Sequence, residues 1–154
     1  MRDFDQALVL SPDQFQILNY VGYSLVERGE MLEEALSMIQ RAVAVQPTAG
    51  YIIDSLGWVQ YRLGYYQDAV VQLERAVELM TTDPVVNDHL GDVYWAVGRK
   101  AEALFQWRRA LSFANEAKGP DDIDPVRVQL KLDIGLDAVL AEEGAPPLQV
   151  ADGY

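Results

Sequence analysis

The chain has 154 residues, none of them cysteine, and a single histidine, His89. The absence of cysteine excludes disulfides, thiolate catalysis and cysteine-ligated zinc, and it leaves both the cytosol and the periplasm open as compartments. Basic residues are also scarce, with 12 lysines and arginines against 24 aspartates and glutamates, which gives a formal net charge of −12. Because such a charge repels phosphate backbones and anionic lipids, we expect neither nucleic acid nor a membrane surface as a partner.

The chain also lacks long apolar runs and the usual catalytic motifs. No stretch of 18 apolar residues indicates a membrane span, and no serine stands in a nucleophile-elbow motif. The acidic segment 121–124 has neither the glycine nor the terminal glutamate of a calcium loop. We therefore expect no enzyme, no cofactor and no bound metal, and we interpret His89 as a satisfied surface histidine. A carboxylate-based enzyme or a weak metal site around Asp54, Asp88 and His89 is the alternative from another functional class.

One sequence pattern recurs three times along the chain. A Val-Gly or Leu-Gly pair, ending at Gly22, Gly57 and Gly91, recurs after 35 and then 34 residues. Each of these glycines is followed seven residues later by a second one, and then by two alanines spaced by seven. These residues are Gly29, Ala35 and Ala42; Gly64, Ala69 and Ala76; and Gly98, Ala103 and Ala110. A fixed period of this size indicates stacked repeats, which form a surface for holding a partner rather than a pocket for transforming one.

Each unit is predicted to be two helices joined by a tight turn. Residues spaced i, i+3, i+4 and i+7 around the first glycine, as at Leu18 and Leu25, mark one buried face of a helix. A glycine in mid-helix costs about 1 kcal/mol against alanine, so its recurrence indicates a neighbouring backbone too close for a Cβ. The second glycine falls where the first helix ends, because glycine enters the left-handed cap conformation without penalty. In the second helix one large residue, Ile39, Leu73 or Trp107, fills the gap between the alanines.

These features resemble the tetratricopeptide repeat, whose motif runs W-x-x-L-G-x-x-Y, then A-x-x-x-F, then P. The matching residues are Leu56-Gly57, Leu90-Gly91 with Tyr94, Ala103 with Trp107, and Pro47. The sequence departs from the motif at Gln60, where an aromatic residue is usual, and by one extra residue between Gly29 and Ala35. The resemblance covers roughly residues 15–117. It implies an all-α, right-handed superhelical solenoid of antiparallel helix pairs.

The pattern divides the chain into repeat units and a C-terminal cap. The predicted segments are 1–14, the second helix of a truncated preceding repeat; 15–49, 50–83 and 84–117, three repeats; 118–143, a linker and capping helix; and 144–154, a disordered tail. The capping helix is expected to run from Asp124-Pro125 to about Glu143, because Val128, Leu132 and Leu136 form one stripe. Since the chain begins in mid-unit, we expect a C-terminal fragment of a longer, bacterial tetratricopeptide-repeat protein.

The predicted binding surface is the inner, concave wall, which the resemblance assigns to the first helices. Offsets of −3, +1 and +4 from each first glycine select the stripe not used for packing. These candidate partner-binding residues are Asn19, Tyr23, Val26, Asp54, Trp58, Tyr61, Asp88, Asp92 and Trp95. Rings that alternate with carboxylates suit a peptide or helix bearing apolar and Lys or Arg side chains. The alternative interpretation is that Trp58, Tyr61 and Trp95 only pack against the next unit.

We therefore predict a protein-interaction scaffold or adaptor that binds a basic or apolar protein segment. Chaperone-binding members of the resembled family hold a C-terminal carboxylate in a clamp, but Tyr23, Ser55 and Val85 stand where that clamp needs an amide or a cation. Self-association of the parent protein is the alternative function. It would form a homodimer through the truncated N-terminal edge, where Phe4 and Leu8 lack a first-helix partner.

Overall fold

The computed structural model describes residues 14–114 and 123–149, and its regular structure is helical. In chain order the helices are α2 (Phe15–Arg28), α3 (Leu32–Val45), α4 (Gly50–Arg62), α5 (Tyr66–Leu79), α6 (Pro84–Ala96), α7 (Lys100–Ala114), α8 (Pro125–Ile134) and α9 (Leu136–Glu142). The described residues contain no strand, which confirms the predicted all-α fold. Within the same residues no helix combines the length and the apolar character needed to cross a membrane.

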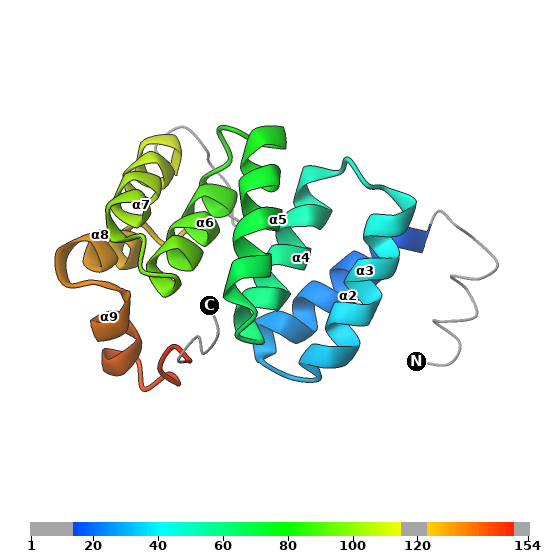
Figure 1. Cartoon of the computed structure of the whole chain (residues 1–154), viewed down its shortest axis with the longest axis horizontal. Helices are drawn as coiled ribbons and strands as arrows, with labels where there is room; N and C mark the ends of the chain where they lie inside the picture. Colours follow the sequence, from blue (N-terminus) through cyan, green and yellow to red (C-terminus); the bar gives the residue numbers. More distant parts are fainter. Residues whose placement is uncertain (1–13, 115–122, 150–154) are drawn as a thin grey trace.

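The helices stack side by side as pairs (Figure 1). α2 packs with α3, α4 with α5 and α6 with α7, and each second helix also packs on the first helix of the next pair. The first helices contact one another along one side of the stack, α2 with α4 and α4 with α6. Two clusters of buried apolar side chains fill the interior, one between α2 and α4 and the other between α4 and α9. Trp58 packs against both clusters and joins them.

The first glycine of each unit lies against the large residue of the second helix. The pairs are Gly22 with Ile39, Gly57 with Leu73 and Gly91 with Trp107. A Cβ added at Gly57 would stand 2.6 Å from the Leu73 side chain, closer than packed atoms approach. The close neighbour is thus mainly a side chain, where the sequence predicted a backbone. The second glycine of each unit has a positive φ angle, as predicted for a helix end.

The C-terminal cap is two helices rather than the single helix predicted. The Asp124 carboxylate accepts the backbone N–H groups of the first turn of α8, and Pro125 begins the helix, as the sequence indicated. α8 packs on α7 and continues the stack (Figure 1). At Gly135 the backbone takes φ 87° and ψ 155°, and a Cβ there would stand 2.8 Å from the Trp95 ring. These backbone angles are not helical, so the helix ends here. Glycine is the residue that takes this conformation beneath an indole ring without strain.

Residues 144–149 turn back from α9 toward α4 and α5 (Figure 1). Leu148 packs against the buried cluster, and the backbone N–H of Gln149 donates to Oη of Tyr66 at 2.8 Å. The prediction that the C-terminal tail has nothing to pack against is therefore wrong for these residues. Residues 1–13, 115–122 and 150–154 lie outside the described residues, and with them the predicted N-terminal helix and its dimer contact.

Candidate functional site

The inner wall is the surface of α2, α4 and α6 formed by the residues at positions −3 and +1 from each first glycine. These residues are Asn19, Tyr23, Asp54, Trp58, Asp88 and Asp92. Burial, then a hydrogen bond to Glu27 and the nearby charges of Asp54 and Asp88, raise the pKa of Tyr23 well above its usual value. The side chain of Tyr23 on α2 therefore stands within the field of carboxylates on α4 and α6. Of these six predicted residues, Asp54 and Asp92 are buried, and the other four are half-buried.

The three residues predicted at position +4 belong to the packing stripe. An i, i+4 spacing puts a residue on the same helix face as the glycine itself. Val26 is fully buried in the core, so the prediction that it contacts a partner is wrong. Tyr61 is buried, and Trp95 is half-buried with its indole N–H donating to Asp137 of α9 at 3.1 Å. For Trp95 the alternative interpretation, packing against neighbouring elements, describes the observed contacts.

Four aromatic rings form a continuous row across α6, α4 and α5, which we call the ring ladder. The His89 ring stacks on Trp58 with centroids 3.8 Å apart, Trp58 stacks on Tyr61 at 4.7 Å, and Tyr61 tilts against Tyr66 at 5.7 Å. The indole N–H of Trp58 is buried and has no hydrogen-bond partner among the described residues. A buried donor left unpaired costs about 1–3 kcal/mol, so this N–H is an unsatisfied polar group within the ring ladder.

The ring ladder begins at a buried ion pair. His89 and Asp54 are both buried, and Nδ1 of His89 lies 2.9 Å from Oδ1 of Asp54. Burial lowers the pKa of His89, but the carboxylate of Asp54, followed by those of Asp88 and Asp92, raises it by more, so the pKa stands above the usual 6.5. The histidine is satisfied, as predicted, but it is buried rather than on the surface. Among the described residues no three His, Cys, Asp or Glu side chains are grouped to hold a metal ion.

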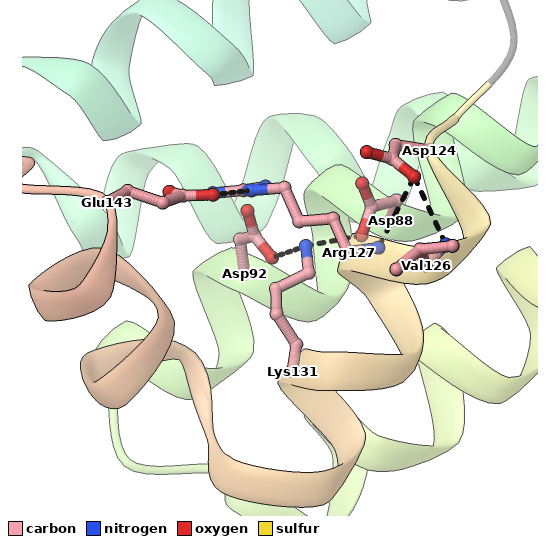
Figure 2. A network of polar contacts seen from close by, with 7 residues as sticks. All are labelled: Asp88, Asp92, Asp124, Val126, Arg127, Lys131 and Glu143. Atoms are coloured by element: carbon pink, nitrogen blue, oxygen red, sulfur yellow. Dashed lines mark hydrogen bonds and ion pairs between the residues drawn. The ribbon is translucent and has the colours of Figure 1, made fainter.

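The acidic pair on α6 already holds a cation (Figure 2). Lys131 of α8 is fully buried, and its Nζ donates to Oδ1 of Asp88 and to Oδ1 of Asp92, both at 2.6 Å. The indole N–H of Trp107 donates to the same Asp92 oxygen at 2.9 Å. Burial lowers the pKa of Lys131, but the two carboxylates raise it by more, so the ammonium stays charged. The carboxylates predicted to receive a partner's cation thus receive the chain's own lysine.

A second ion pair fastens α8 to the end of α9. The guanidinium of Arg127 donates to both carboxylate oxygens of Glu143, at 2.7 and 3.1 Å (Figure 2). This hydrogen bonding raises the pKa of Arg127 and lowers the pKa of Glu143. Because α8 is also tied to α6 through Lys131, the two helices of the cap are held over one end of the inner wall.

A cavity of about 480 Å³ lies between the inner wall and the C-terminal segment. One side is formed by Gly29, Leu32, Trp58, Tyr61, Arg62, Tyr66 and Asp92. The other side is formed by Arg127, Leu140, Glu143 and residues 145–149. Three rings of the ring ladder, Trp58, Tyr61 and Tyr66, therefore face the cavity. Its volume falls in the range typical of ligand sites, roughly 300–1,000 Å³.

Part of the chain is similar in sequence to a known protein. A TPR repeat-containing protein of Pseudomonas aeruginosa is 35% identical to the chain over 68 residues. The match takes in 44% of this chain and 12% of the relative, so the chain spans a small part of that protein's length. No family model matches the chain.

Solved structures resemble the chain over most of its length. The translocator chaperone SycD of Yersinia enterocolitica has a TM-score of 0.66 at 17% identity, covering 87% of this chain and 97% of that one. PcrH bound to the chaperone binding region of PopD has a TM-score of 0.68 at 19% identity, covering 86% and 96%. A thermophilic TPR protein of Thermus thermophilus has a TM-score of 0.67 at 23% identity, covering 88% and 70%. The fold is that of the tetratricopeptide repeat.

Several residues that hold the cap in place or line the cavity were missed by sequence reasoning. Lys131, Arg127 and Glu143 belong to the cap, outside the three repeats that supplied the pattern. One signal was present, because Lys131 stands three residues after Val128 on the stripe predicted to be buried. A lysine at a buried position requires carboxylate partners, and an acidic repeat surface supplies them.

Proposed function

We propose that the chain is a protein-interaction module that binds an extended peptide of a partner protein in the cavity beside the ring ladder. The observation that carries the proposal is the cavity itself, with Trp58, Tyr61 and Tyr66 along one side. Aromatic rings offer large apolar contact areas to a bound segment. This lining suits the apolar side chains of a bound peptide.

The proposed peptide is apolar rather than strongly basic. Asp54 is paired with His89, and Lys131 donates to both carboxylates of α6, so each of these three carboxylates already has a partner within the chain. A partner's cation would have to replace the fully buried Lys131, and breaking a buried ion pair costs about 3–5 kcal/mol. Apolar side chains meet no such cost against the rings.

Proteins of the same fold support a peptide partner as the class of ligand. PcrH structures are described as complexes with the chaperone binding regions of PopD and of PopB, and SycD is described as a translocator chaperone. These bound segments and this chaperone role are properties of PcrH and SycD. For this chain they favour the binding of a protein segment over the conversion of a small molecule.

The proposal is tested by selecting peptides from a random phage-displayed library against the full chain. We expect the selected peptides to share apolar side chains and to shift the indole N–H signal of Trp58 in two-dimensional NMR spectra. The signals of Trp95 and Trp107 should shift less, because those N–H groups already donate to carboxylates. Trp58→Ala should weaken a selected peptide by roughly tenfold or more, since an interface aromatic is worth about 1.4 kcal/mol or more.

Two further variants serve as controls. Trp58→Phe keeps an aromatic ring on His89 and removes only the indole N–H, so it should weaken binding by less than Trp58→Ala. Phe105→Ala is the matched control, because Phe105 lies exposed on α7 and does not line the cavity. If Trp58→Ala folded like the wild type and bound a selected peptide equally well, the peptide would bind elsewhere and the proposal would be overturned. Selected peptides dominated by lysine and arginine would favour the cationic partner predicted from the sequence.

A further inference from the structure

Residues 145–149, which we call the strap, form part of the cavity wall that faces the ring ladder. At the end of α9 the N–H groups of Gly144 and Ala145 donate back to the last turn of that helix, and the chain turns toward the second unit. The strap then runs without helical structure to Tyr66, whose Oη accepts the N–H of Gln149 at 2.8 Å. The Gln149 side chain lies against Gly64, at a place where a Cβ would collide with it. The strap therefore touches the turn between α4 and α5 and the end of the ring ladder.

The contacts of the strap are those of a bound peptide rather than those of a core segment. Leu148 is half-buried against the apolar cluster, whereas Pro146, Pro147 and Gln149 are exposed. Proline has no N–H to donate, and its fixed φ keeps a segment extended, so little chain entropy is lost when the strap docks. An apolar anchor and one backbone hydrogen bond are groups that another extended peptide can supply equally well.

We propose that the strap is an internal ligand that occupies part of the partner site and must leave before a partner peptide binds beside Tyr66. This inference rests on the proposed function, because it concerns the regulation of the same cavity. The strap, Ala-Pro-Pro-Leu-Gln, is an extended segment that lines the cavity in which an extended apolar peptide is proposed to bind, and it contacts Tyr66 at the end of the ring ladder. Its covalent tether gives it an effective concentration of roughly millimolar order. The apparent affinity of a partner is therefore its intrinsic affinity multiplied by the fraction of molecules in which the strap is undocked.

The test compares two full-length proteins, the wild type and a double variant, Leu148→Ser with Gln149→Pro. The double variant removes the apolar anchor and the N–H donor of the strap while leaving the ring ladder intact. The probe is a fluorescently labelled synthetic peptide that copies residues 144–150, Gly-Ala-Pro-Pro-Leu-Gln-Val. We expect the probe to bind the double variant with a shift of the Trp58 indole signal, and to bind the wild type at least roughly tenfold more weakly because the strap competes.

A matched control and two adverse outcomes complete the test. Val126→Ser changes an exposed apolar residue of the cap away from the cavity, so it should bind the probe as weakly as the wild type does. Equal binding of the probe to the wild type and to the double variant would overturn the inference. Absence of binding to the double variant would overturn it too, because the cavity would then have no affinity for the strap sequence.

The phage-selected peptides report on the proposed function separately from the strap. If they bind in a manner that depends on Trp58 while the probe shows either adverse outcome, the proposed function holds and the strap inference alone is wrong. If the probe binds the double variant while the selected peptides are indifferent to Trp58, the strap is a structural closure. In that case the proposed function fails, and the role of the strap as a competitor fails with it.

Discussion

At the residue scale, the stacking of His89 on Trp58 makes the inner wall sensitive to pH, because the imidazole ring can gain or lose a proton. A protonated imidazole over an indole is a cation against an aromatic face, and Asp54 fixes it there through a 2.9 Å hydrogen bond. The other carboxylates that act on the ring are Asp88 and Asp92. His89 therefore ties α6 to α4 most strongly when it carries a charge.

The stability of the array is expected to depend on pH through His89. Because the pKa of His89 is raised by folding, the stabilisation is fully present below the unfolded-state pKa of about 6.5 and is lost as the pH rises through the folded-state pKa. Asp54→Asn removes the carboxylate that raises the pKa most. The difference in unfolding free energy between the wild type and Asp54→Asn should therefore be largest near pH 6 and smaller at pH 8.

Urea denaturation at a series of pH values measures this difference. The folded-state pKa can be read directly by NMR, because the only histidine of the chain gives a single imidazole signal. We expect that signal to titrate above pH 6.5 in the wild type and at lower pH in Asp54→Asn. A stability difference that grows from pH 6 to pH 8 would contradict the assigned role of the pair.

At the element scale, α8 continues the stack of helices and uses a charged anchor to do so. It packs on α7 as a further first helix would, and its buried Lys131 reaches two carboxylates of α6. The two carboxylates keep the ammonium charged, whereas burial raises the pKa of Asp92, Lys131 lowers it and Asp88 raises it. Lys131 thus holds the cap over the inner wall together with the buried apolar side chains of Val128 and Leu136.

Lys131→Met is expected to destabilise the chain by about 3–5 kcal/mol, because it leaves Asp92 buried without its cation. The double variant Lys131→Met with Asp92→Asn should recover part of this loss, since the uncompensated charge is then gone. Thermal or urea melts of the two variants measure the difference. If Lys131→Met alone melted like the wild type, the ammonium would not be the anchor of α8.

The sequence predicted the elements whose signals are local and periodic. The glycines and alanines of each unit mark helix pairs and their ends, and Asp124-Pro125 marks the start of α8. Val26 was misassigned because position +4 repeats the face of the packing glycine. The Lys131 contacts and the strap bring together residues that are far apart in the chain. The repeat pattern is local and therefore does not indicate which distant residues meet. The break at Gly135 had a local signal in the glycine itself, but its cause, the overlying Trp95, lies on another helix.

At the scale of the whole molecule, the dimer predicted from the sequence is still to be tested. Light scattering should report a dimer for the full chain and a monomer after deletion of residues 1–14, which carry the apolar Phe4, Leu8 and Val9. The deletion leaves the described helices in place, so its circular dichroism spectrum should stay helical. A dimer that persists after the deletion would move the contact to another surface.

The bond from Gln149 to Tyr66 gives the array a different topology from an open row. In a linear stack each repeat touches only its neighbours, and unfolding can begin at either end and travel inward. Here the chain runs from Tyr66 through α5, α6, α7, α8 and α9, and it returns to Tyr66 through the strap, a circuit that spans 83 residues. The C-terminal end of the row is then no longer a free end. Fraying from that side must first open the circuit, so the third unit and the cap should come apart together rather than one helix at a time.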